Sequence, residues 1–257
     1  MSMTIKTYSN FVTVVTKFKL FVVLPAAILY LISQLFLFNN YTWILTGILL
    51  YYVFHFLGYS IGGHKLFSHR TFTPVVWFPY VTVIIASICF YGNPIMSAVV
   101  HRTHHRYADT DQDPHSPCKG RWHAFFGWLI GYKLPSTRIA ADLVRDFPFL
   151  KTYEKIEWII LPVFYITVAF ISNWLLLACL LGAVLSYLNG MIVNAFSHDP
   201  GALGDNKAVN NILLARFVNP VFLQKDHHED DSLYDYSTPE VKDFSVYFIR
   251  RFLIKSS

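Results

Sequence analysis

The sequence predicts an all-α integral membrane protein with one domain over residues 1–257: four transmembrane helices, further interfacial helices and a histidine-rich cap at the inner membrane face. Charged residues make up 14% of the 257 residues and hydrophobic residues 54%, whereas a soluble domain carries roughly 25% charged residues. The mean hydropathy is positive. Because no linker, low-complexity stretch or internal repeat interrupts the chain, we expect a single domain.

Four apolar segments approach or exceed the roughly 20 residues that a membrane-spanning helix needs. They form two pairs: Phe18–Phe38 with Tyr41–Gly58, and Trp158–Ile171 with Trp174–Met191. The links inside the pairs contain no Lys or Arg, so the positive-inside rule predicts that both links lie outside. Every histidine cluster then lies on the cytosolic side of a bacterial inner membrane or of the endoplasmic reticulum. The formal charge of +5 follows from basic flanks of this kind, and we expect no nucleic-acid partner.

Two shorter apolar segments are predicted to lie in the membrane interface. Val75–Tyr91 contains Pro79 and would separate the first two histidine clusters if it crossed, so we expect it to dip in without crossing; a fifth short span is the alternative. Gly120–Tyr132 carries aromatic residues suited to the headgroup zone and is predicted to be a second interfacial helix. A basic amphipathic tail after the acidic stretch Glu229–Asp235 is expected on the inner surface. Met1–Lys19 lacks the features of a cleaved signal peptide.

Three clusters beside apolar segments contain eight of the 11 histidines: His64 and His69; His101, His104 and His105; His198, His227 and His228. Neutral imidazole is the commonest metal ligand, and ionisable groups at membrane depth are costly, so they rarely gather without function. Helical residues three and four apart share a face, whereas adjacent ones diverge by about 100°. The adjacent pairs at 104–105 and 227–228 therefore suit two metal ions side by side. His55 stands alone and is expected to be a core residue.

The ligand set restricts the metal without fixing it. Imidazole suits zinc, copper, iron and nickel. Structural zinc prefers a closed tetrahedron of four ligands, whereas this set supplies four or five candidates for each of two ions. Cys89, Cys118 and Cys179 are widely spaced and predict neither a thiolate site nor a disulfide. Iron and copper are favoured over zinc, and the choice between them stays open at this point.

Three motifs and their flanks carry a resemblance to a known family. They are Gly63-His64-Lys-Leu-Phe-Ser-His69-Arg70, then His101-Arg-Thr-His104-His105-Arg-Tyr107 with Asp109-Thr-Asp-Gln-Asp113-Pro-His115, and last Asn194-Ala-Phe-Ser-His198 followed by His227-His228. With the stretch Gly120–Gly131, they resemble the membrane fatty-acid desaturase family, in its acyl-CoA desaturase branch, from about Gly58 to His228.

The resemblance implies two iron ions (Fe²⁺), with O2 as co-substrate. One iron would be held by His64, His105 and His228, with Asn194 near it through a water, and the other by His69, His101, His104, His198 and His227. A long-chain fatty acyl substrate, carried by CoA, acyl carrier protein or a lipid, would gain a cis double bond of the delta-9 type. Electrons would come from a separate donor, a ferredoxin or a small cytochrome with its reductase, because we find no haem-attachment motif and no cysteine cluster.

The third motif departs from the family pattern His-x-x-His-His. Gln224 stands at the place of the first histidine, and a Gln carbonyl oxygen is a weaker, harder ligand than imidazole; it would bind iron or leave the place to water. Hydroxylation, acetylenic bond formation or decarboxylation on the same scaffold stays an alternative, as does an inactive site. A membrane metal transporter or metal-binding protein is the alternative from another class, although transporters usually place their sites near the bilayer midplane.

Several polar residues near the motifs have two interpretations. Asp109, Asp111 and Asp113 would orient ligand imidazoles through their free N–H groups or form a solvated acidic loop. The two arginines of the second motif would contact the phosphates of an acyl carrier or lipid headgroups. His115 matches no ligand position, and a role beside the ligands or at the surface is expected.

Overall fold

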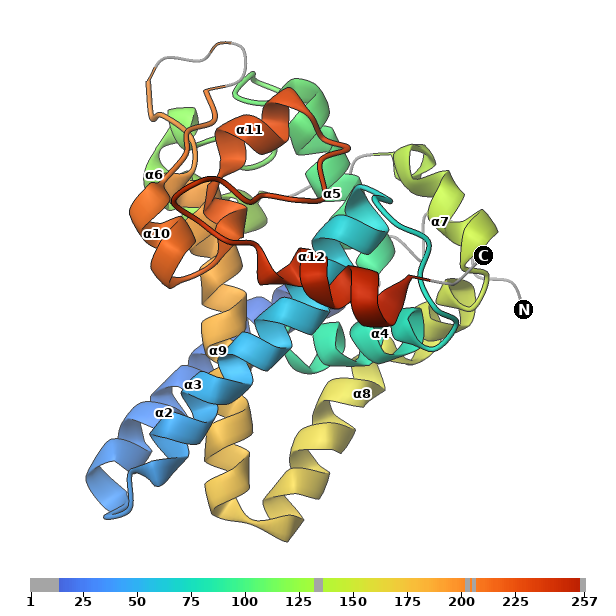
Figure 1. Ribbon diagram of the computed structural model, residues 1–257. Helices are drawn as coiled ribbons and strands as arrows, with labels where there is room; N and C mark the ends of the chain where they lie inside the picture. The colour runs from blue at the N-terminus through green and yellow to red at the C-terminus, as the bar shows by residue number, and fades with distance from the viewer. Residues whose placement is uncertain (1–13, 132–135, 202–203, 205–206, 255–257) are drawn as a thin grey trace.

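The computed structural model describes residues 14–131, 136–201, 204 and 207–254, which fold into helices, turns and three isolated β-bridges. Figure 1 shows two long helical hairpins that project from a group of shorter helices. The first hairpin consists of η1 (Lys19–Val23) with α2 (Leu24–Leu37), and α3 (Thr42–Phe54) with the π-helical η2 (His55–Ser68). The second consists of α8 (Leu150–Ile171) and α9 (Asn173–Phe196).

The shorter elements lie between the hairpins and after them. Between them are α4 (Phe78–Ile88), α5 (Pro94–Tyr107), η3 (Pro117–Lys119), α6 (Arg121–Phe125), η4 (Gly127–Leu129), η5 (Thr137–Ala140) and α7 (Ala141–Asp146). After them are α10 (Ile212–Phe217), η6 (Pro220–Phe222), α11 (Gln224–Glu229), α12 (Phe244–Phe248) and η7 (Ile249–Leu253). In Figure 1, α5 and α11 lie at the same end of the molecule, away from the tips of the hairpins.

Each hairpin forms where the sequence ends one apolar helix and starts the next. Asn40 Oδ1 accepts the backbone N–H at the start of α3 at 3.0 Å, and Ser172 caps α9 in the same way, as short polar side chains do at helix starts. Gly47 of α3 faces Gly182 of α9 so closely that a Cβ on Gly182 would lie 3.0 Å from the Gly47 carbonyl oxygen. Small residues allow this close packing of the two hairpins.

Among the described residues, three helices are long and apolar enough to cross a membrane: Val14–Leu37, Thr42–Ser68 and Asn173–Phe196, with 24, 27 and 24 residues. They cover three of the four predicted spans except for the end residues Phe38 and Tyr41. The fourth, Trp158–Ile171, is the apolar part of α8, a helix of 22 residues whose N-terminal third carries Lys and Glu side chains. α4 has 11 residues, about 16 Å at 1.5 Å per residue. That is about half of the bilayer's hydrocarbon core, so α4 is too short for a fifth crossing on its own.

One predicted helix is not formed as a single element, and other predictions lie outside the described residues. The segment Gly120–Tyr132 is divided into α6 and η4, because Phe126 takes a φ of −147° between them. The aromatic side chains thus lie on two short turns instead of one interfacial helix. Most of Met1–Lys19, for which we predicted no cleaved signal peptide, lies outside the described residues, as do Tyr132 and the last three residues of the tail.

The C-terminal segment is anchored to the helix that carries the first histidine cluster. Lys65 is fully buried and donates to Asp243 Oδ2 at 2.5 Å and to Ser245 Oγ at 2.6 Å. It also donates to the Tyr234 carbonyl oxygen at 2.6 Å, and its ammonium lies 4.5 Å from the centre of the Tyr236 ring. The tail therefore covers the end of η2 and places Tyr236 among the histidines.

Candidate metal centre

The first histidine pair lies on the π-helical end of the second long helix. In a π-helix each backbone N–H bonds to the carbonyl five residues earlier, and the His69 N–H donates to the His64 carbonyl oxygen at 3.0 Å. The spacing of five residues therefore places the two side chains on the same face of the helix, with ring centroids 4.7 Å apart. A spacing that would diverge on an α-helix converges here.

The second cluster lies on α5, which begins at a defined cap. Asn93 Oδ1 accepts a backbone N–H two residues further on at 2.8 Å, and Pro94 takes the first helical position, both of which favour a helix start. Further along, His101 and His105 share one face, with Nε2 atoms 3.1 Å apart. His101 Nε2 also lies 2.7 Å from His69 Nε2, so the first two clusters meet.

His104 points to another side of α5. Its Nε2 lies 3.2 Å from His228 Nε2 on α11, and its ring centroid lies 4.9 Å from that of His198, which follows the end of α9. The adjacent residues His104 and His105 thus diverge, as predicted from helix geometry. α5, α11 and the residue that follows α9 therefore meet at His104.

Within the described residues, three groups of candidate ligand atoms result, and within each group all atoms lie within 4.8 Å of one another. One of them joins His104 to Asp113 and His115. The other two consist of cluster histidines alone: the first group is His64, His69, His101 and His227, and the second is His104, His198 and His228. His105 lies between them, because its ring centroid is 4.6 Å from that of His227 and 4.1 Å from that of His228. The structure therefore brings all eight cluster histidines together.

The division into two groups differs from the one that the family resemblance implied. That division put His64 with His228 and placed His104 in the set of His101. In the structure, His104 Nδ1 lies 2.9 Å from Asp113 Oδ2, which holds the ring toward His198 instead. Which of the eight histidines would bind which iron therefore stays a prediction.

Buried hydrogen-bond partners stand behind three of the histidines. The pairs are His104 Nδ1 with Asp113 Oδ2 at 2.9 Å, His198 Nδ1 with Asp109 Oδ2 at 2.7 Å, and His227 Nδ1 with the Tyr236 hydroxyl at 3.0 Å. A carboxylate that accepts the Nδ1–H fixes the tautomer whose Nε2 lone pair is free for a metal. Asp109 and Asp113 thus take the orienting position that the sequence allowed, whereas Asp111 is exposed.

Four imidazoles of the centre have a lowered pKa, which favours their neutral form. Burial, followed by the neighbouring imidazoles, holds the pKa of His101, His104, His105 and His227 well below the usual range. Burial acts to raise the pKa of Asp109, but hydrogen bonds from the His198 ring and from other donors outweigh it and lower that pKa. Neutral nitrogen donors backed by a carboxylate are suited to a divalent cation.

Two ring nitrogens test whether the centre fits a metal. His64 Nε2 and His227 Nε2 are buried without a hydrogen-bond partner, although buried polar atoms are nearly always paired. They belong to one group with His69 and His101, whose facing Nε2 atoms are 2.7 Å apart. Coordination to a cation would satisfy all four nitrogens, and this nitrogen-rich, thiolate-free set fits iron.

Two amide side chains lie beside the second group. Asn194 and Gln224 line a small cavity together with His104 and His198. Gln224 is buried, and its Nε2 donates to the Val221 carbonyl oxygen at 2.5 Å. Both side chains thus lie next to the centre. Gln224 stands where the family pattern has a histidine, and Asn194 is the residue for which a water-mediated contact to an iron was expected.

His115 is buried beside the ligands, with its ring centroid 4.3 Å from that of His104, which is one of the two places expected for it. Tyr236 has a role that the sequence did not reveal, because it bonds to His227 from the tail and nothing in the sequence marked it. By contrast, His55 is a core residue as expected, since its Nε2 lies 2.8 Å from the Asn189 amide.

Arg102 makes several structural hydrogen bonds. Its guanidinium donates to the Ser68 carbonyl oxygen at 2.7 Å and to the Phe67 carbonyl oxygen at 3.0 Å. It also binds both carboxylate oxygens of Asp142, at 2.6 and 3.0 Å. Arg102 therefore ties α5 to the end of η2 and to α7, and it holds the first two histidine clusters in register.

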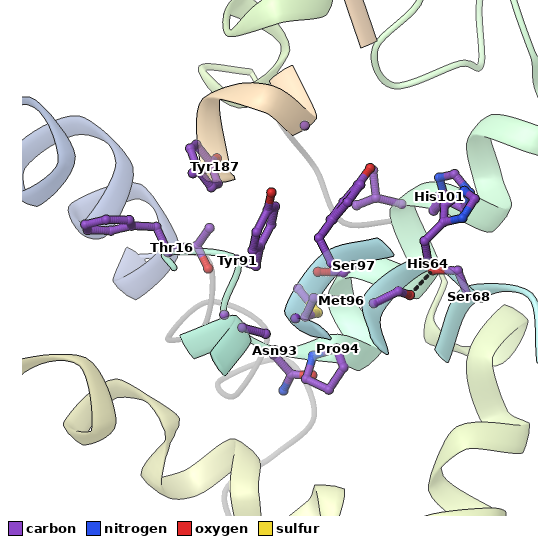
Figure 2. Close-up of a pocket in the computed structure, with 18 of the residues that line it drawn as sticks. Thr16, His64, Ser68, Tyr91, Asn93, Pro94, Met96, Ser97, His101 and Tyr187 are labelled. Atoms are coloured by element: carbon purple, nitrogen blue, oxygen red, sulfur yellow. Dashed lines mark hydrogen bonds between the residues drawn. The ribbon is translucent and has the colours of Figure 1, made fainter. Parts of the chain in front are cut away.

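An apolar cavity of about 160 Å³ adjoins the first histidine group. Figure 2 shows His64 and His101 at one side of it and Tyr187 and Thr16 at the other. Met96 of α5 lies between them. The cavity therefore offers an apolar ligand a place next to the candidate metal centre.

These features define a helical protein with membrane-spanning segments, a two-part histidine centre and an apolar cavity beside it. Residues 39–243 match the fatty acid desaturase family, so this chain belongs to that family.

Several relatives have named activities. An sn-1 stearoyl-lipid 9-desaturase from Anabaena variabilis is 38% identical over 123 residues, which cover 45% of this chain and 45% of the relative. A hex-5-enoyl-acyl-carrier-protein acetylenase from Moorena producens is 32% identical over 168 residues, covering 58% and 50%. A stearoyl-CoA desaturase from Bos taurus is 29% identical over 231 residues, covering 82% and 63%. The chain matches about half the length of the first two relatives.

Proposed function

We propose that this protein is an oxygen-dependent desaturase that introduces a cis double bond into a long-chain fatty acyl substrate at a histidine-held pair of iron ions. The observation that carries the proposal is the convergence of eight histidines, with the buried free Nε2 atoms of His64 and His227, beside an apolar cavity. Membership of the fatty acid desaturase family supports an enzyme over a metal transporter.

The chain's own residues would hold the two irons and keep their ligands in place. The ligands would be the eight cluster histidines, with Asn194 and Gln224 as further oxygen donors, directly or through water. When bound, the irons would supply the activation of O2. Asp109, Asp113 and Tyr236 would hold the imidazole rings through Nδ1, so that the Nε2 atoms face the metals. In the overall reaction, O2 takes two electrons from a donor, two protons from solution and two hydrogen atoms from the acyl C–H bonds, and it leaves as two waters.

The cavity would orient the acyl chain. Because methylenes are chemically alike, only placement next to the irons selects one of them, and the wall beside His64 and His101 would give that placement. Delta-9 selectivity is proposed from the named stearoyl-lipid and stearoyl-CoA relatives. The substrate's carrier would be CoA, acyl carrier protein or a lipid.

The membrane arrangement follows from the positive-inside rule. The three long apolar helices and the apolar part of α8 would give four crossings, with α4 in the interface. The histidine centre would then lie on the cytosolic side of a bacterial inner membrane or the endoplasmic reticulum. A ferredoxin or a small cytochrome with its reductase would deliver electrons from that side. A polar surface groove lined by His69, His105 and His228 leads to the centre from outside.

Acetylenic bond formation is the second candidate reaction. Two observations favour it: Gln224 replaces an imidazole at the centre, and a relative with 32% identity is an acetylenase. A changed ligand would alter the redox properties of the nearby iron without changing where the acyl chain lies.

Mass spectrometry of the fatty acids in cells that make the protein together with a ferredoxin tests the proposal. We expect a new unsaturated species that is absent with His104→Ala and present with the control His123→Ala, because His123 bonds to the Pro114 carbonyl oxygen outside both ligand groups. An acetylenic or hydroxylated product would favour the second class of reaction. An unchanged fatty-acid profile from a protein that contains iron and receives electrons would contradict an acyl substrate.

A further inference from the structure

A second apolar space lies on the far side of the N-terminal helix from the metal cavity. This groove has a volume of about 780 Å³ and is lined by described residues of the first long helix, α8 and α9. Its lining includes Val23 and Ala27 from the first helix, Leu161 and Ile166 from α8, and Leu176 from α9. Polar atoms make up little of it. The groove thus runs along segments that would lie at membrane depth.

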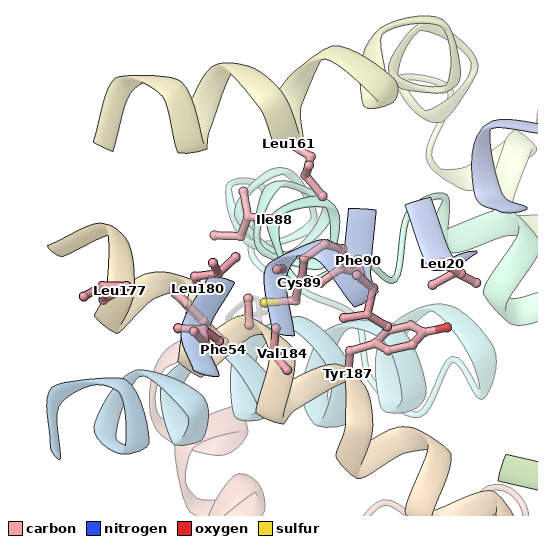
Figure 3. Packing of buried hydrophobic residues seen from close by; sticks show 14 of the residues in the cluster. Leu20, Phe54, Ile88, Cys89, Phe90, Leu161, Leu177, Leu180, Val184 and Tyr187 are labelled. Atoms are coloured by element: carbon pink, nitrogen blue, oxygen red, sulfur yellow. The ribbon is translucent and has the colours of Figure 1, made fainter. Parts of the chain in front are cut away.

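One helix forms the wall between the groove and the metal cavity. Val15 and Phe18 line the groove, whereas Thr16 and Leu20 line the metal cavity, as expected for opposite faces of one helix. Phe90 lines both spaces. Figure 3 shows Phe90 near Leu20 and Tyr187, in the packed centre of the hairpins. Phe90 therefore borders both spaces and forms part of the partition between them.

Phe90 has a backbone conformation that a phenylalanine rarely adopts. Its φ is 68°, in the left-handed region that ends helices and that glycine normally occupies. Phe90 follows the end of α4, and the next residue's N–H bonds back to the Ala86 carbonyl oxygen at 3.0 Å. A non-glycine residue in this conformation is strained. The position thus carries an aromatic ring in spite of its backbone, which points to a function for the ring.

The groove has one charged end. Lys19 lines it and pairs with Glu157 at 3.1 Å, and both side chains are less than 10% exposed. Gly92 lies against this pair, since a Cβ there would be 2.8 Å from Lys19 Nζ. The opposite end, at Leu176 and Ala169, is apolar. With this ion-paired end at the inner face, the groove matches a lipid whose polar group lies inward and whose acyl chain extends toward the bilayer centre.

We propose that this groove takes one acyl chain of an inner-leaflet lipid and that the chain passes Phe90 to reach the metal cavity. The passage of the chain to the metal cavity rests on the proposed function. The binding of a lipid in the groove does not depend on it. A bilayer acyl chain is the occupant that the chemistry favours, because the apolar lining faces the membrane through exposed side chains such as Phe18 and Ile166, each 57% exposed. The groove and the metal cavity share a wall, so a chain held in the groove starts next to its site of reaction.

Photo-crosslinking tests the occupant without any need for activity. Wild-type protein in nanodiscs would be irradiated with a phosphatidylcholine that carries a diazirine in its acyl chain, and the modified peptides would be identified by mass spectrometry. We expect labels on groove residues such as Val23. The labels should disappear in Ala26→Trp/Ala169→Trp, which fills the groove, and persist in the control Leu29→Trp/Thr167→Trp, which places two tryptophans on the same helices outside it. Labels that ignore the blocking pair, or cross-links between two copies of the chain through the groove, would overturn the proposal.

The same experiment tests the partition. Phe90→Gly keeps the left-handed backbone and removes the ring, so labels should extend to cavity residues such as Met96. Labels confined to the groove in a folded Phe90→Gly protein would contradict a passage at this point.

Activity measurements then separate the route from the reaction. On acyl chains supplied in bilayer lipid, the blocked variant should be at least about tenfold slower, a difference of about 1.4 kcal/mol in barrier, with unchanged rates on a short water-soluble acyl thioester. Equal rates for the blocked and control variants on bilayer lipid would overturn the route. If the wild-type protein formed no product while its groove was still labelled, the result would contradict the proposed function and leave the lipid site intact.

Discussion

Asp109 Oδ2 lies 2.7 Å from Nδ1 of His198, a residue 89 positions further along the chain. Asp109 is fully buried and has a φ of 61°, so the loop after α5 adopts a costly conformation to bring this carboxylate behind the end of α9. The same oxygen accepts the Lys207 backbone N–H at 2.7 Å. One carboxylate therefore joins the second and third histidine clusters.

Asp109→Asn should weaken the metal centre without unfolding the protein. An amide keeps the shape but removes the charge that raises the basicity of His198, and changes of this kind typically cost about 10–100-fold in metal affinity or activity. Iron content after dialysis against a chelator measures the effect. Asp111→Asn is the matched control, because Asp111 is exposed in the same loop. Equal iron retention in the two variants would show that Asp109 does not support a ligand.

Gln224→His should strengthen iron binding. Gln224 lines the same small cavity as His104 and His198, and imidazole is a better iron ligand than a carboxamide oxygen. We expect iron to be held about tenfold more tightly, or about 1.4 kcal/mol, in a chelator titration. Gln224→Ala should lose less iron than His104→Ala. Tighter binding in Gln224→Ala than in wild type would contradict a supporting role for the amide.

Arg102→Lys should destabilise the fold, because lysine cannot reproduce the fork that binds Asp142 and two backbone carbonyls. Left without donors, these partly buried acceptors should cost about 1 kcal/mol, seen as a lower melting temperature in detergent. Arg106→Lys, at an exposed position of the same helix, should melt like wild type. A melting temperature for Arg102→Lys equal to that of Arg106→Lys would show that the Arg102 hydrogen bonds do not stabilise the fold.

The Arg102 pair should also lose its effect in acid. Burial acts to raise the pKa of Asp142, but the hydrogen bond and charge of Arg102, aided by Arg70, lower it below its usual value. A depressed carboxyl pKa gives stability that is present above the unfolded value of about 4 and is lost as the pH falls below it. The difference in melting temperature between wild type and Arg102→Lys should therefore shrink below about pH 4. A constant difference down to the folded pKa would contradict this assignment.

Lys65→Met should be one of the most destabilising substitutions in the chain. It leaves Asp243 buried without its cation, and breaking a buried pair in this way costs about 3–5 kcal/mol. Thermal unfolding in detergent measures the loss, and Lys65→Met/Asp243→Leu should recover part of it, since neither charge is then buried. Lys242→Met, at an exposed position beside Asp243, serves as the control. A melting temperature like that of the control would show that the tail is not anchored through Lys65.

Local patterns were sufficient to predict the long helices and the way the histidines cluster. Apolar runs and polar links determine where a hairpin such as Phe18–Gly58 forms, and spacing determines that His104 and His105 diverge. The sequence could not reveal that His64 and His69 converge, because that depends on a π-helical backbone. It also gave no sign that Gly120–Tyr132 would be interrupted at Phe126.

Long-range contacts account for the rest. Asp109 and Asp113 lie in one acidic loop whose side chains look alike in sequence, and only the packing of α9 against that loop makes Asp109 a partner of His198. Tyr236 and Lys65 gained their roles from the tail folding back over η2, a contact across about 170 positions. The division of the histidines into two groups depended on the same tertiary contacts.

Metal analysis of the purified protein tests the central claim most directly. The protein would be made in iron-supplemented cells, purified without chelator and measured for iron, zinc and copper per chain. The account predicts two irons per chain, falling to one or fewer in the variant His198→Ala, which removes a ligand from the second group. One tightly bound zinc or copper, or no metal in a folded protein, would contradict a histidine-held pair of irons.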